Sequence, residues 1–251
     1  MNARVLEVVG LAKAFGGVHA VHGVSFDVAA GELVALIGPN GAGKTTCFNL
    51  INGQLSPDAG SVRLGGERID GLTPRLVAHK GVARTFQVAA TFASMSVREN
   101  VELALIAHAR REGDLITRQA EKWRARADEV LAHVGVRELA DVHCATLTYG
   151  DAKRVELALA LAGMPRLLLL DEPTAGMALA ARADLMRLAA ELSHRDGLAV
   201  LFTEHDMDVV FSYADRVIVL DRGAIIASGT AAEIRANALV QAVYLGLDEP
   251  A

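Results

Sequence analysis

The sequence predicts an α/β fold built on a largely parallel β-sheet. Its 251 residues are 52% hydrophobic but only 4% aromatic, so the core consists mainly of Val, Leu, Ile and Ala. This composition fits an α/β protein better than an aromatic-rich β-sandwich. Apolar strand-like runs alternate with helical patterns along the second half of the chain, and this alternation is typical of parallel sheets. The length suits one large domain, or a core with a subdomain.

The expected elements follow in chain order. Short β-rich runs separated by glycine turns fill the first third, and the segment at 56–60 (SPDAG) is a strong turn signal. Between about residues 97 and 134, apolar residues recur at helical spacing with charged residues between them, which indicates a helical subdomain inserted into the core. The expected strands are 5–9, 24–28, 33–37, 61–64, 81–85, 167–170, 198–203 and 217–220, and later helices are expected at 155–162 and 181–193.

The segment between the strand at 33–37 and a following helix matches the phosphate-binding loop pattern G-x-x-x-x-G-K-[ST]. Its glycines let the backbone turn and point N–H groups at phosphate oxygens. Lys44 can reach the β- and γ-phosphates, and the Thr45 hydroxyl is placed to ligate Mg²⁺. The alternative, a glycine-rich turn without this function, is disfavoured by the strand–loop–helix setting. The sequence therefore predicts a nucleoside triphosphate site at Gly38, Pro39, Asn40, Gly41, Ala42, Gly43, Lys44, Thr45 and Thr46.

A second motif follows the apolar run at 167–170, which ends in Asp171 and Glu172. A buried strand delivers such acids to the carboxyl edge of a parallel sheet, where α/β proteins bind ligands. Asp171 can hold Mg²⁺, usually through water, and Glu172 can orient the attacking water or accept its proton. Taken alone, the two acids could equally cap the next helix, but the phosphate loop favours the catalytic interpretation.

With these motifs the sequence resembles the nucleotide-binding subunit of an ABC transporter over about residues 6–246. The resemblance implies a P-loop NTPase, with a RecA-like parallel-sheet core, an antiparallel β subdomain and an inserted helical subdomain. It implies one nucleotide-binding domain, 1–251, in which 1–87 and 155–235 form the core with the β subdomain. Residues 88–154 would form the helical subdomain with the signature motif, and 236–251 a C-terminal tail. ATP and Mg²⁺ are the implied ligands, and ATP hydrolysis is the implied activity.

The resemblance adds three residues to the site. Phe15 stands where the family places an aromatic ring that stacks on adenine, although a core position is the alternative. Gln87 matches a glutamine that contacts both Mg²⁺ and the attacking water, so it joins the implied metal ligands. His205 matches the histidine that bonds the γ-phosphate. The other histidines lack such a context and are interpreted as surface or structural residues: His19, His22, His79, His108, His133, His143 and His194.

Two sets of roles follow from these matches. The implied catalytic residues are Glu172, His205, Lys44 and Gln87, and the implied metal ligands are Thr45, Gln87 and Asp171.

Residues 147–151 (LTYGD) resemble the family signature L-S-G-G-Q and end 20 residues before Asp171. In the family this segment closes over the γ-phosphate that a second subunit holds, so Thr148 and Gly150 are the implied contacts. The implied active form is a head-to-tail dimer with two ATP molecules at its interface, formed with an identical or a related chain. Such a dimer lets ATP act as a switch, because binding joins the subunits and hydrolysis releases them.

The signature region departs from the family pattern at two positions. Asp151 replaces the usual Gln, and we expect it to form a capping box in which its carboxylate accepts from the Thr148 N–H. The neighbouring Lys153 and Arg154 would offset its charge. Ala178 stands where the family commonly has Asp or Asn, and it cannot make the cross-dimer hydrogen bond of those residues.

Several phrases resemble the subgroup that serves importers of branched-chain or other hydrophobic amino acids. They are Tyr149, the segments 171–177 and 204–210, and the ending at 243–246. The implied partners are transmembrane permease subunits and, indirectly, a substrate-binding protein. A helix of the membrane subunit would enter a groove near residues 87–95. The alternatives are an ATPase of a lipopolysaccharide exporter, an ABC ATPase without a transporter, and a cassette that hydrolyses ATP only slowly.

Charge and composition also favour a subunit that reaches the membrane through partners. The net charge of −5 and the pI of about 5.9 provide no broad basic surface for nucleic acid. Two cysteines without a C-x-x-C pair suit a reducing compartment. We find neither a signal peptide nor an apolar run near the ~20 residues that cross a bilayer. The expected location is the cytoplasm, peripheral on the inner face of the membrane.

Overall fold

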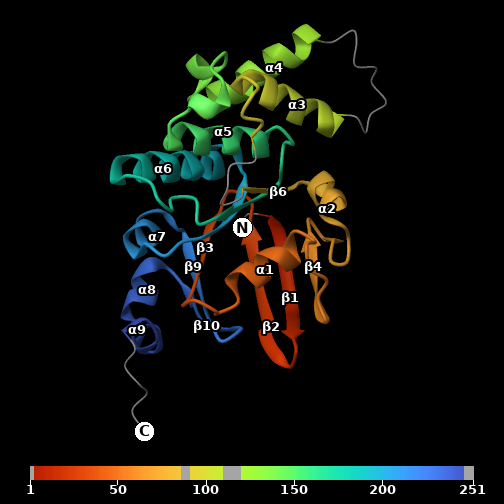
Figure 1. Cartoon of the computed structure of the whole chain (residues 1–251). Helices are drawn as coiled ribbons and strands as arrows, with labels where there is room; N and C mark the ends of the chain where they lie inside the picture. Colours follow the sequence, from red (N-terminus) through yellow and green to blue (C-terminus); the bar gives the residue numbers. More distant parts are fainter. Residues whose placement is uncertain (1–2, 86–90, 110–119, 246–251) are drawn as a thin grey trace.

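The computed structural model describes residues 3–85, 91–109 and 120–245, and it contains two β-sheets (Figure 1). The smaller sheet has four antiparallel strands in the order β2-β1-β4-β5. The larger sheet has six strands in the order β10-β9-β3-β8-β7-β6, and all its neighbours are parallel except β10 and β9. The predicted α/β class, with a parallel core sheet and a separate antiparallel sheet, is confirmed.

The strands have the following bounds. In the smaller sheet they are β1 (Arg4–Phe15), β2 (Val18–Ala29), β4 (Ala59–Leu64) and β5 (Glu67–Arg68). In the larger sheet they are β3 (Leu33–Ile37), β6 (Val82–Thr85), β7 (Leu167–Asp171), β8 (Ala199–Thr203), β9 (Arg216–Asp221) and β10 (Ala224–Gly229). Every residue of β3, β7 and β8 is buried, which explains why these central strands are continuous apolar runs in the sequence.

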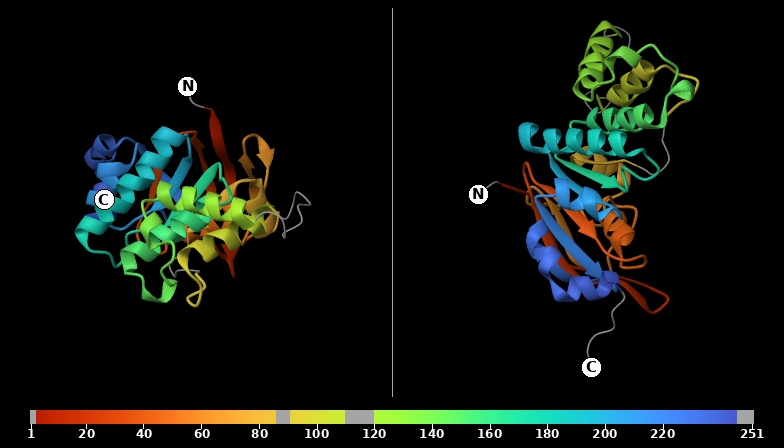
Figure 2. Two further views of the ribbon diagram at one scale, coloured as in Figure 1. Left: turned by 90° about the horizontal axis from the view of Figure 1, so that it is seen from above. Right: turned by 90° about the vertical axis from the view of Figure 1, so that its left-hand side faces the viewer.

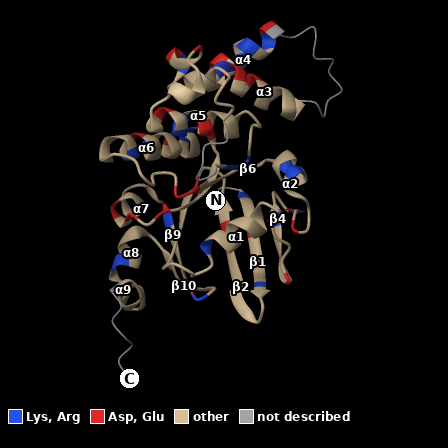
Figure 3. Ribbon diagram, in the orientation of Figure 1, with Lys and Arg blue, Asp and Glu red and all other residues tan. Residues whose placement is uncertain are grey.

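The helices cover the parallel sheet and extend beyond it. They are α1 (Lys44–Ile51), α2 (Pro74–Lys80), α3 (Val97–Ala109), α4 (Ala120–His133), α5 (Tyr149–Leu161), α6 (Leu179–Asp196), α7 (Met207–Tyr213), α8 (Ala231–Ala236) and α9 (Ala238–Leu245). In the side view of Figure 2, α3 and α4 stand at one end of the molecule, beyond α5 and α6. The outlying α4 carries charged residues of both signs (Figure 3), as expected of a largely solvated helix.

The alternation of side chains along β3 divides the core into two parts. Leu33, Ala35 and Ile37 belong to a cluster shared with the helices α3 to α7, whereas Val34 and Leu36 belong to a second cluster. That second cluster contains residues of α1 and of the antiparallel sheet. The parallel sheet is therefore buried on both faces, and its carboxyl edge is left for a site.

Several expected boundaries are corrected by the structure. The strand at 33–37 is as predicted, but β1 and β2 each run for 12 residues. Register shifts in β1 let the strand continue through Gly10, which adopts φ 58°, so the glycine that ends the apolar run does not end the strand. The turn signal at 56–60 ends early, because β4 already begins at Ala59. The short elements α2, α7, α8, α9 and β10 were not among the expected ones.

The expected helix at 155–162 begins earlier in the structure. α5 starts at Tyr149, because the Thr148 side chain accepts a hydrogen bond from the Asp151 N–H and caps the helix there. The expected boundary between residues 154 and 155 consequently falls inside α5. This helix contacts both α3 and α4 at one end of the molecule and β6 of the core sheet.

Candidate nucleotide-binding site

The phosphate loop lies at the carboxyl end of β3 and leads directly into α1. Its backbone conformation requires glycine at two positions, since Gly38 has φ 156° and Gly43 has φ 105°. A Cβ atom at Gly38 would lie 2.2 Å from the carbonyl oxygen of Leu220, and one at Gly43 would lie 2.3 Å from that of Ala20. The loop is thus held tightly against β9 and β2.

Lys44 opens α1 and is only 7% exposed. Its Nζ donates hydrogen bonds to the carbonyl oxygens of Gly38 at 2.7 Å and Pro39 at 3.2 Å, so the ammonium group lies inside the loop. Burial lowers the pKa of Lys44, while the nearby carboxylates of Glu172 and Asp171 act in the opposite direction. The Lys44 ammonium group is therefore electrostatically coupled to the two acids at the end of β7.

Several other residues of the loop are accessible to solvent. Asn40, Gly41 and Thr45 are exposed, and Thr46 is half-buried, in the first turn of α1 or just before it. The N-terminus of α1 has no side-chain cap and no acidic residue in its first turn. Its N–H groups and its positive dipole end are therefore available to an anion.

Asp171 ends β7 opposite Thr203 of β8, its partner in the parallel register. Its Oδ1 accepts from Thr203 Oγ1 at 2.9 Å, and its Oδ2 accepts from Arg84 Nη2 at 2.7 Å. The carboxylate is thus held in one orientation by two donors. Arg84 was not among the predicted site residues; the one signal for it in the sequence was its place in the strand expected at 81–85, three residues before Gln87.

Glu172 has a left-handed backbone conformation, with φ 48°, which is uncommon for a residue other than glycine. Its Oε1 lies 2.8 Å from His205 Nε2, so two of the predicted catalytic side chains meet. Strain of this kind costs on the order of 1–3 kcal/mol and is concentrated at functional sites. The strained turn aims the Glu172 carboxylate at the histidine.

Of the two predicted site residues Phe15 and Gln87, the structure describes only Phe15. Phe15 ends β1 and is 47% exposed, with Lys13 Nζ 5.7 Å from its ring centroid. It is therefore not a core aromatic residue, and its ring is open to a stacking ligand. Gln87 lies outside the described residues.

Thr148 and Gly150 lie at the start of α5, and in Figure 1 this helix lies apart from the connection between β3 and α1. Thr148 is exposed and bonds Asp151, whereas a Cβ at Gly150 would be nearest to Ala181 Cβ at 3.8 Å and Met177 Cε at 3.9 Å. This separation agrees with a role for the signature residues toward a second subunit.

One of the two hydrogen bonds of the expected capping box at Asp151 differs in the structure. Thr148 Oγ1 accepts from the Asp151 N–H at 3.2 Å, but the Asp151 carboxylate accepts from the Thr148 hydroxyl, at 2.6 Å, and not from its N–H. The expected charge compensation is also different. Lys153 is buried in an ion pair with Glu156 at 2.9 Å, and Arg154 lies 4.0 Å from Asp184. These basic side chains therefore compensate other carboxylates.

The signature helix contacts the segment that follows Glu172. Tyr149, whose ring is half exposed, donates from its hydroxyl to the carbonyl oxygen of Ala175 at 3.0 Å. Ala178 precedes α6 without a side-chain capping bond, and Leu179 beside it is 82% exposed.

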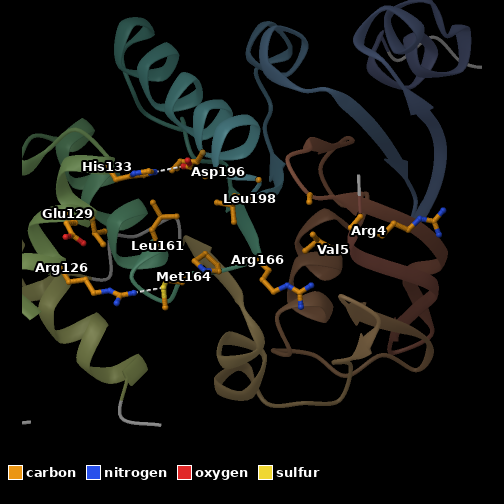
Figure 4. A pocket seen from close by; sticks show the side chains of 16 residues that line it. Arg4, Val5, Arg126, Glu129, His133, Leu161, Met164, Arg166, Asp196 and Leu198 are labelled. Carbon is orange, nitrogen blue, oxygen red and sulfur yellow. Dashed lines mark hydrogen bonds and ion pairs between the residues drawn. The ribbon is translucent and has the colours of Figure 1, made fainter. Parts of the chain in front are cut away.

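A separate cavity of about 680 Å³ lies between α4 and the end of α6 (Figure 4). His133 of α4 and Asp196 of α6 are paired at 2.7 Å beside it, and none of the predicted site residues lines it. The predicted nucleotide site is instead an open edge formed by the loops after β3, β7 and β8.

A phosphate loop between β3 and α1, faced by Asp171, Glu172 and His205 and joined to a helical region, defines an ATP-binding cassette. The chain belongs to the ABC transporter family, whose model matches residues 21–175. A second model, described as "Branched-chain amino acid ATP-binding cassette transporter", matches residues 224–249.

Known relatives resemble the chain over almost its whole length. The high-affinity branched-chain amino acid transport ATP-binding protein BraF of Pseudomonas aeruginosa is 41% identical and covers 98% of this chain and 99% of its own. The lipopolysaccharide export system ATP-binding protein LptB of Escherichia coli is 37% identical over 97% of this chain and 98% of its own. The crystal structure of the ADP conformation of MJ1267, an ATP-binding cassette of an ABC transporter, matches this chain with a TM-score of 0.86 at 31% identity. The match covers 97% of this chain and 99% of the MJ1267 chain.

Proposed function

We propose that this chain is the ATP-binding and ATP-hydrolysing subunit of an ABC importer for branched-chain or related hydrophobic amino acids. The similarity to BraF supports this cargo class, and so does the match of residues 224–249 to the branched-chain transporter model. The similarity to LptB keeps a lipopolysaccharide exporter as the second candidate. The C-terminal match favours the importer.

In this proposal the loop 38–46 and the N-terminus of α1 bind the phosphates of ATP, and Phe15 stacks on the adenine. Lys44 neutralises charge on the β- and γ-phosphates. Its position supports this role. The Lys44 ammonium group now bonds the carbonyl oxygens of Gly38 and Pro39 inside the loop, and it would move only a short distance to bond phosphate oxygens instead.

The donor set fits Mg²⁺. Thr45 is exposed at the first turn of α1, and Asp171 has two of its roughly four lone-pair positions occupied by Thr203 and Arg84. With Gln87 these residues offer hard oxygen ligands, which Mg²⁺ prefers. Among the described residues, no cluster of three or more His, Cys, Asp or Glu could hold a metal. Thr45, Asp171 and Gln87 would hold the ion beside the phosphates, where it would supply charge stabilisation.

Hydrolysis depends on Glu172 and His205 in this scheme. Glu172 positions the water for in-line attack, and His205 bonds the γ-phosphate. The observation that carries the proposal is the 2.8 Å contact between Glu172 Oε1 and His205 Nε2 at the edge shared with Lys44. This contact supports the proposal, because it brings the proposed base and the proposed γ-phosphate ligand within hydrogen-bond distance of each other.

The proposed partners are a second cassette and the permease subunits. Thr148 and Gly150 act on the nucleotide held by the second cassette, an identical or a related chain. A groove of about 530 Å³ between α3 and the core is suited to a helix of the permease, since it is lined by Phe92, Leu103 and the small side chains Ala104, Ala107 and Ala160. Phe92 is 58% exposed there.

The location of the subunit follows from these partners. No helix in the described parts of the chain is long and apolar enough to span a bilayer. With the proposed partners, the chain would be held peripherally on the inner face of the membrane by the permease, with the substrate-binding protein a more distant member of the assembly.

Single-turnover ATP hydrolysis tests the catalytic assignment. Glu172→Gln should bind MgATP normally and lower the hydrolysis rate by about 10²–10⁴-fold, the usual contribution of a general base. Glu191→Gln, an exposed change on α6, is the matched control and should leave the rate unchanged. Equal rates for Glu172→Gln and the wild type would exclude the role of Glu172. Leucine uptake by the chain reconstituted with its permease subunits would distinguish the importer from the exporter.

A further inference from the structure

A buried carboxylate, Glu204, joins the two loops that carry Glu172 and His205. Its Oε1 accepts two hydrogen bonds from Thr174, one from the N–H at 2.8 Å and one from the hydroxyl at 2.7 Å. Its Oε2 accepts from the N–H of His205 at 3.3 Å. One side chain therefore connects the backbone of His205 to a residue two positions beyond Glu172.

This arrangement is costly for a residue that has only a structural role. Glu204 is 5% exposed and Thr174 is 1% exposed. Among the residues that the structure describes, Glu204 has no ion-pair partner, and its interactions are these hydrogen bonds. Burying a carboxylate without a cation costs free energy that apolar packing would avoid. The bonds are therefore better explained by the geometry that they impose on the two loops.

Two other contacts hold the same loops together. At the end of the strands, the Glu172 N–H donates to the carbonyl oxygen of Thr203 at 3.1 Å. Further along, Arg182 of α6 bonds the carboxylate of Asp206 at 2.9 Å and the carbonyl oxygen of Met177 at 2.7 Å. In the sequence, Glu204 lies between Thr203 and Asp206, which make these two contacts, and directly before His205.

We propose that Glu204 is a positioning residue that sets the distance between His205 and Glu172. Thr174 anchors one carboxylate oxygen, and the other oxygen fixes the backbone from which the His205 side chain extends. This inference rests on the proposed function, because it assumes that His205 and Glu172 act in ATP hydrolysis. Glu204 touches neither the nucleotide loop nor the reacting atoms in this scheme, so its effect passes through His205.

Glu204→Gln is the sharpest test, because the change is nearly isosteric. An amide has one acceptor oxygen, so its NH₂ group must face either the Thr174 donors or the His205 N–H. We expect kcat at saturating MgATP to fall about ten- to hundred-fold, the scale of a displacement near 1 Å, with KM changed less than about threefold. Thr174→Val, which removes one donor, should give a smaller loss, and Thr174→Ser should retain wild-type kcat.

Glu32→Gln is a control away from the site. Glu32 also accepts a backbone N–H bond, from Ala29 at 2.8 Å, and it is paired with Arg216 at 2.7 Å, just before β3 at the opposite edge of the sheet. This variant should lose stability without losing kcat. If Glu204→Gln unfolds, the comparison of Thr174→Val with Thr174→Ser still decides the question, since equal kcat values for those two variants would refute the proposal.

A double-mutant cycle with His205→Ala separates positioning from general stability. If Glu204 acts through His205, Glu204→Gln should lower kcat less than about twofold in the His205→Ala background. Fully additive losses would overturn the inference and leave the proposed function intact. If His205→Ala and Glu172→Gln both hydrolyse ATP at the wild-type rate, the catalytic assignment itself fails.

Discussion

Arg84→Gln tests the buried ion pair between β6 and β7. The side chains of Arg84 and Asp171 are only 9% and 10% exposed, and their charged atoms are 2.7 Å apart. Arg84 Nη1 also donates to Asn49 Oδ1 at 2.7 Å and to Gln54 Oε1 at 3.2 Å. Removing the guanidinium group leaves the Asp171 carboxylate buried without that cation. Breaking such a pair costs about 3–5 kcal/mol, which corresponds to a fall in Tm of about 6–20 °C for a chain of this size.

Urea unfolding followed by circular dichroism measures this loss. Arg187→Gln is the matched control, because the Arg187–Asp184 pair at 2.5 Å is 63% and 44% exposed and should contribute less than about 0.5 kcal/mol. The double variant Arg84→Gln/Asp171→Asn should recover more than half of the lost stability, because the buried Asp171 charge is then removed together with its cation. If Arg84→Gln lowered stability no more than Arg187→Gln, the reasoning from burial would be refuted.

Two further predictions concern the phosphate loop and the helix that follows it. Gly43→Ala should abolish ATP binding and lower Tm, because its Cβ would lie 2.3 Å from the Ala20 carbonyl oxygen. At Gly41 a Cβ meets nothing within 4 Å, so Gly41→Ala should cost only the backbone strain of about 1–2 kcal/mol. Equal ATP affinities of the two variants by calorimetry would contradict this prediction. Burial raises the pKa of Cys47 from 9.0 to about 12. Between those pH values the unfolded thiol loses its proton and the folded thiol keeps it, so stability should fall by about 1.4 kcal/mol per pH unit. Cys47→Ala should lack this contribution in denaturation at pH 10 and pH 11, and an identical slope would show that the thiol ionises in the folded state.

Local patterns were sufficient to predict the central strands and the phosphate loop. The strand at 33–37 was predicted with its observed bounds because a strand buried on both faces is a continuous apolar run. The start of α5 was missed, because Tyr149 and Gly150 do not look like the first turn of a helix. That turn depends on the capping hydrogen bond of the Thr148 side chain. The extent of β1 was missed because Gly10 interrupts the apolar pattern, although a register shift lets the strand continue.

The amino-acid order alone was enough to predict the glycine-rich loop after β3, the acids at the end of β7 and the histidine after β8 as site residues, because each motif depends on neighbouring residues. Only the packed sheet could bring Arg84 to Asp171 across 87 positions and Glu204 to Thr174 across 30. The strand order β8-β7-β6 makes these segments neighbours, and spatial order in a sheet is a property of the whole chain. The predicted site residues can therefore be named from the sequence, whereas the contacts that hold them in position depend on long-range packing.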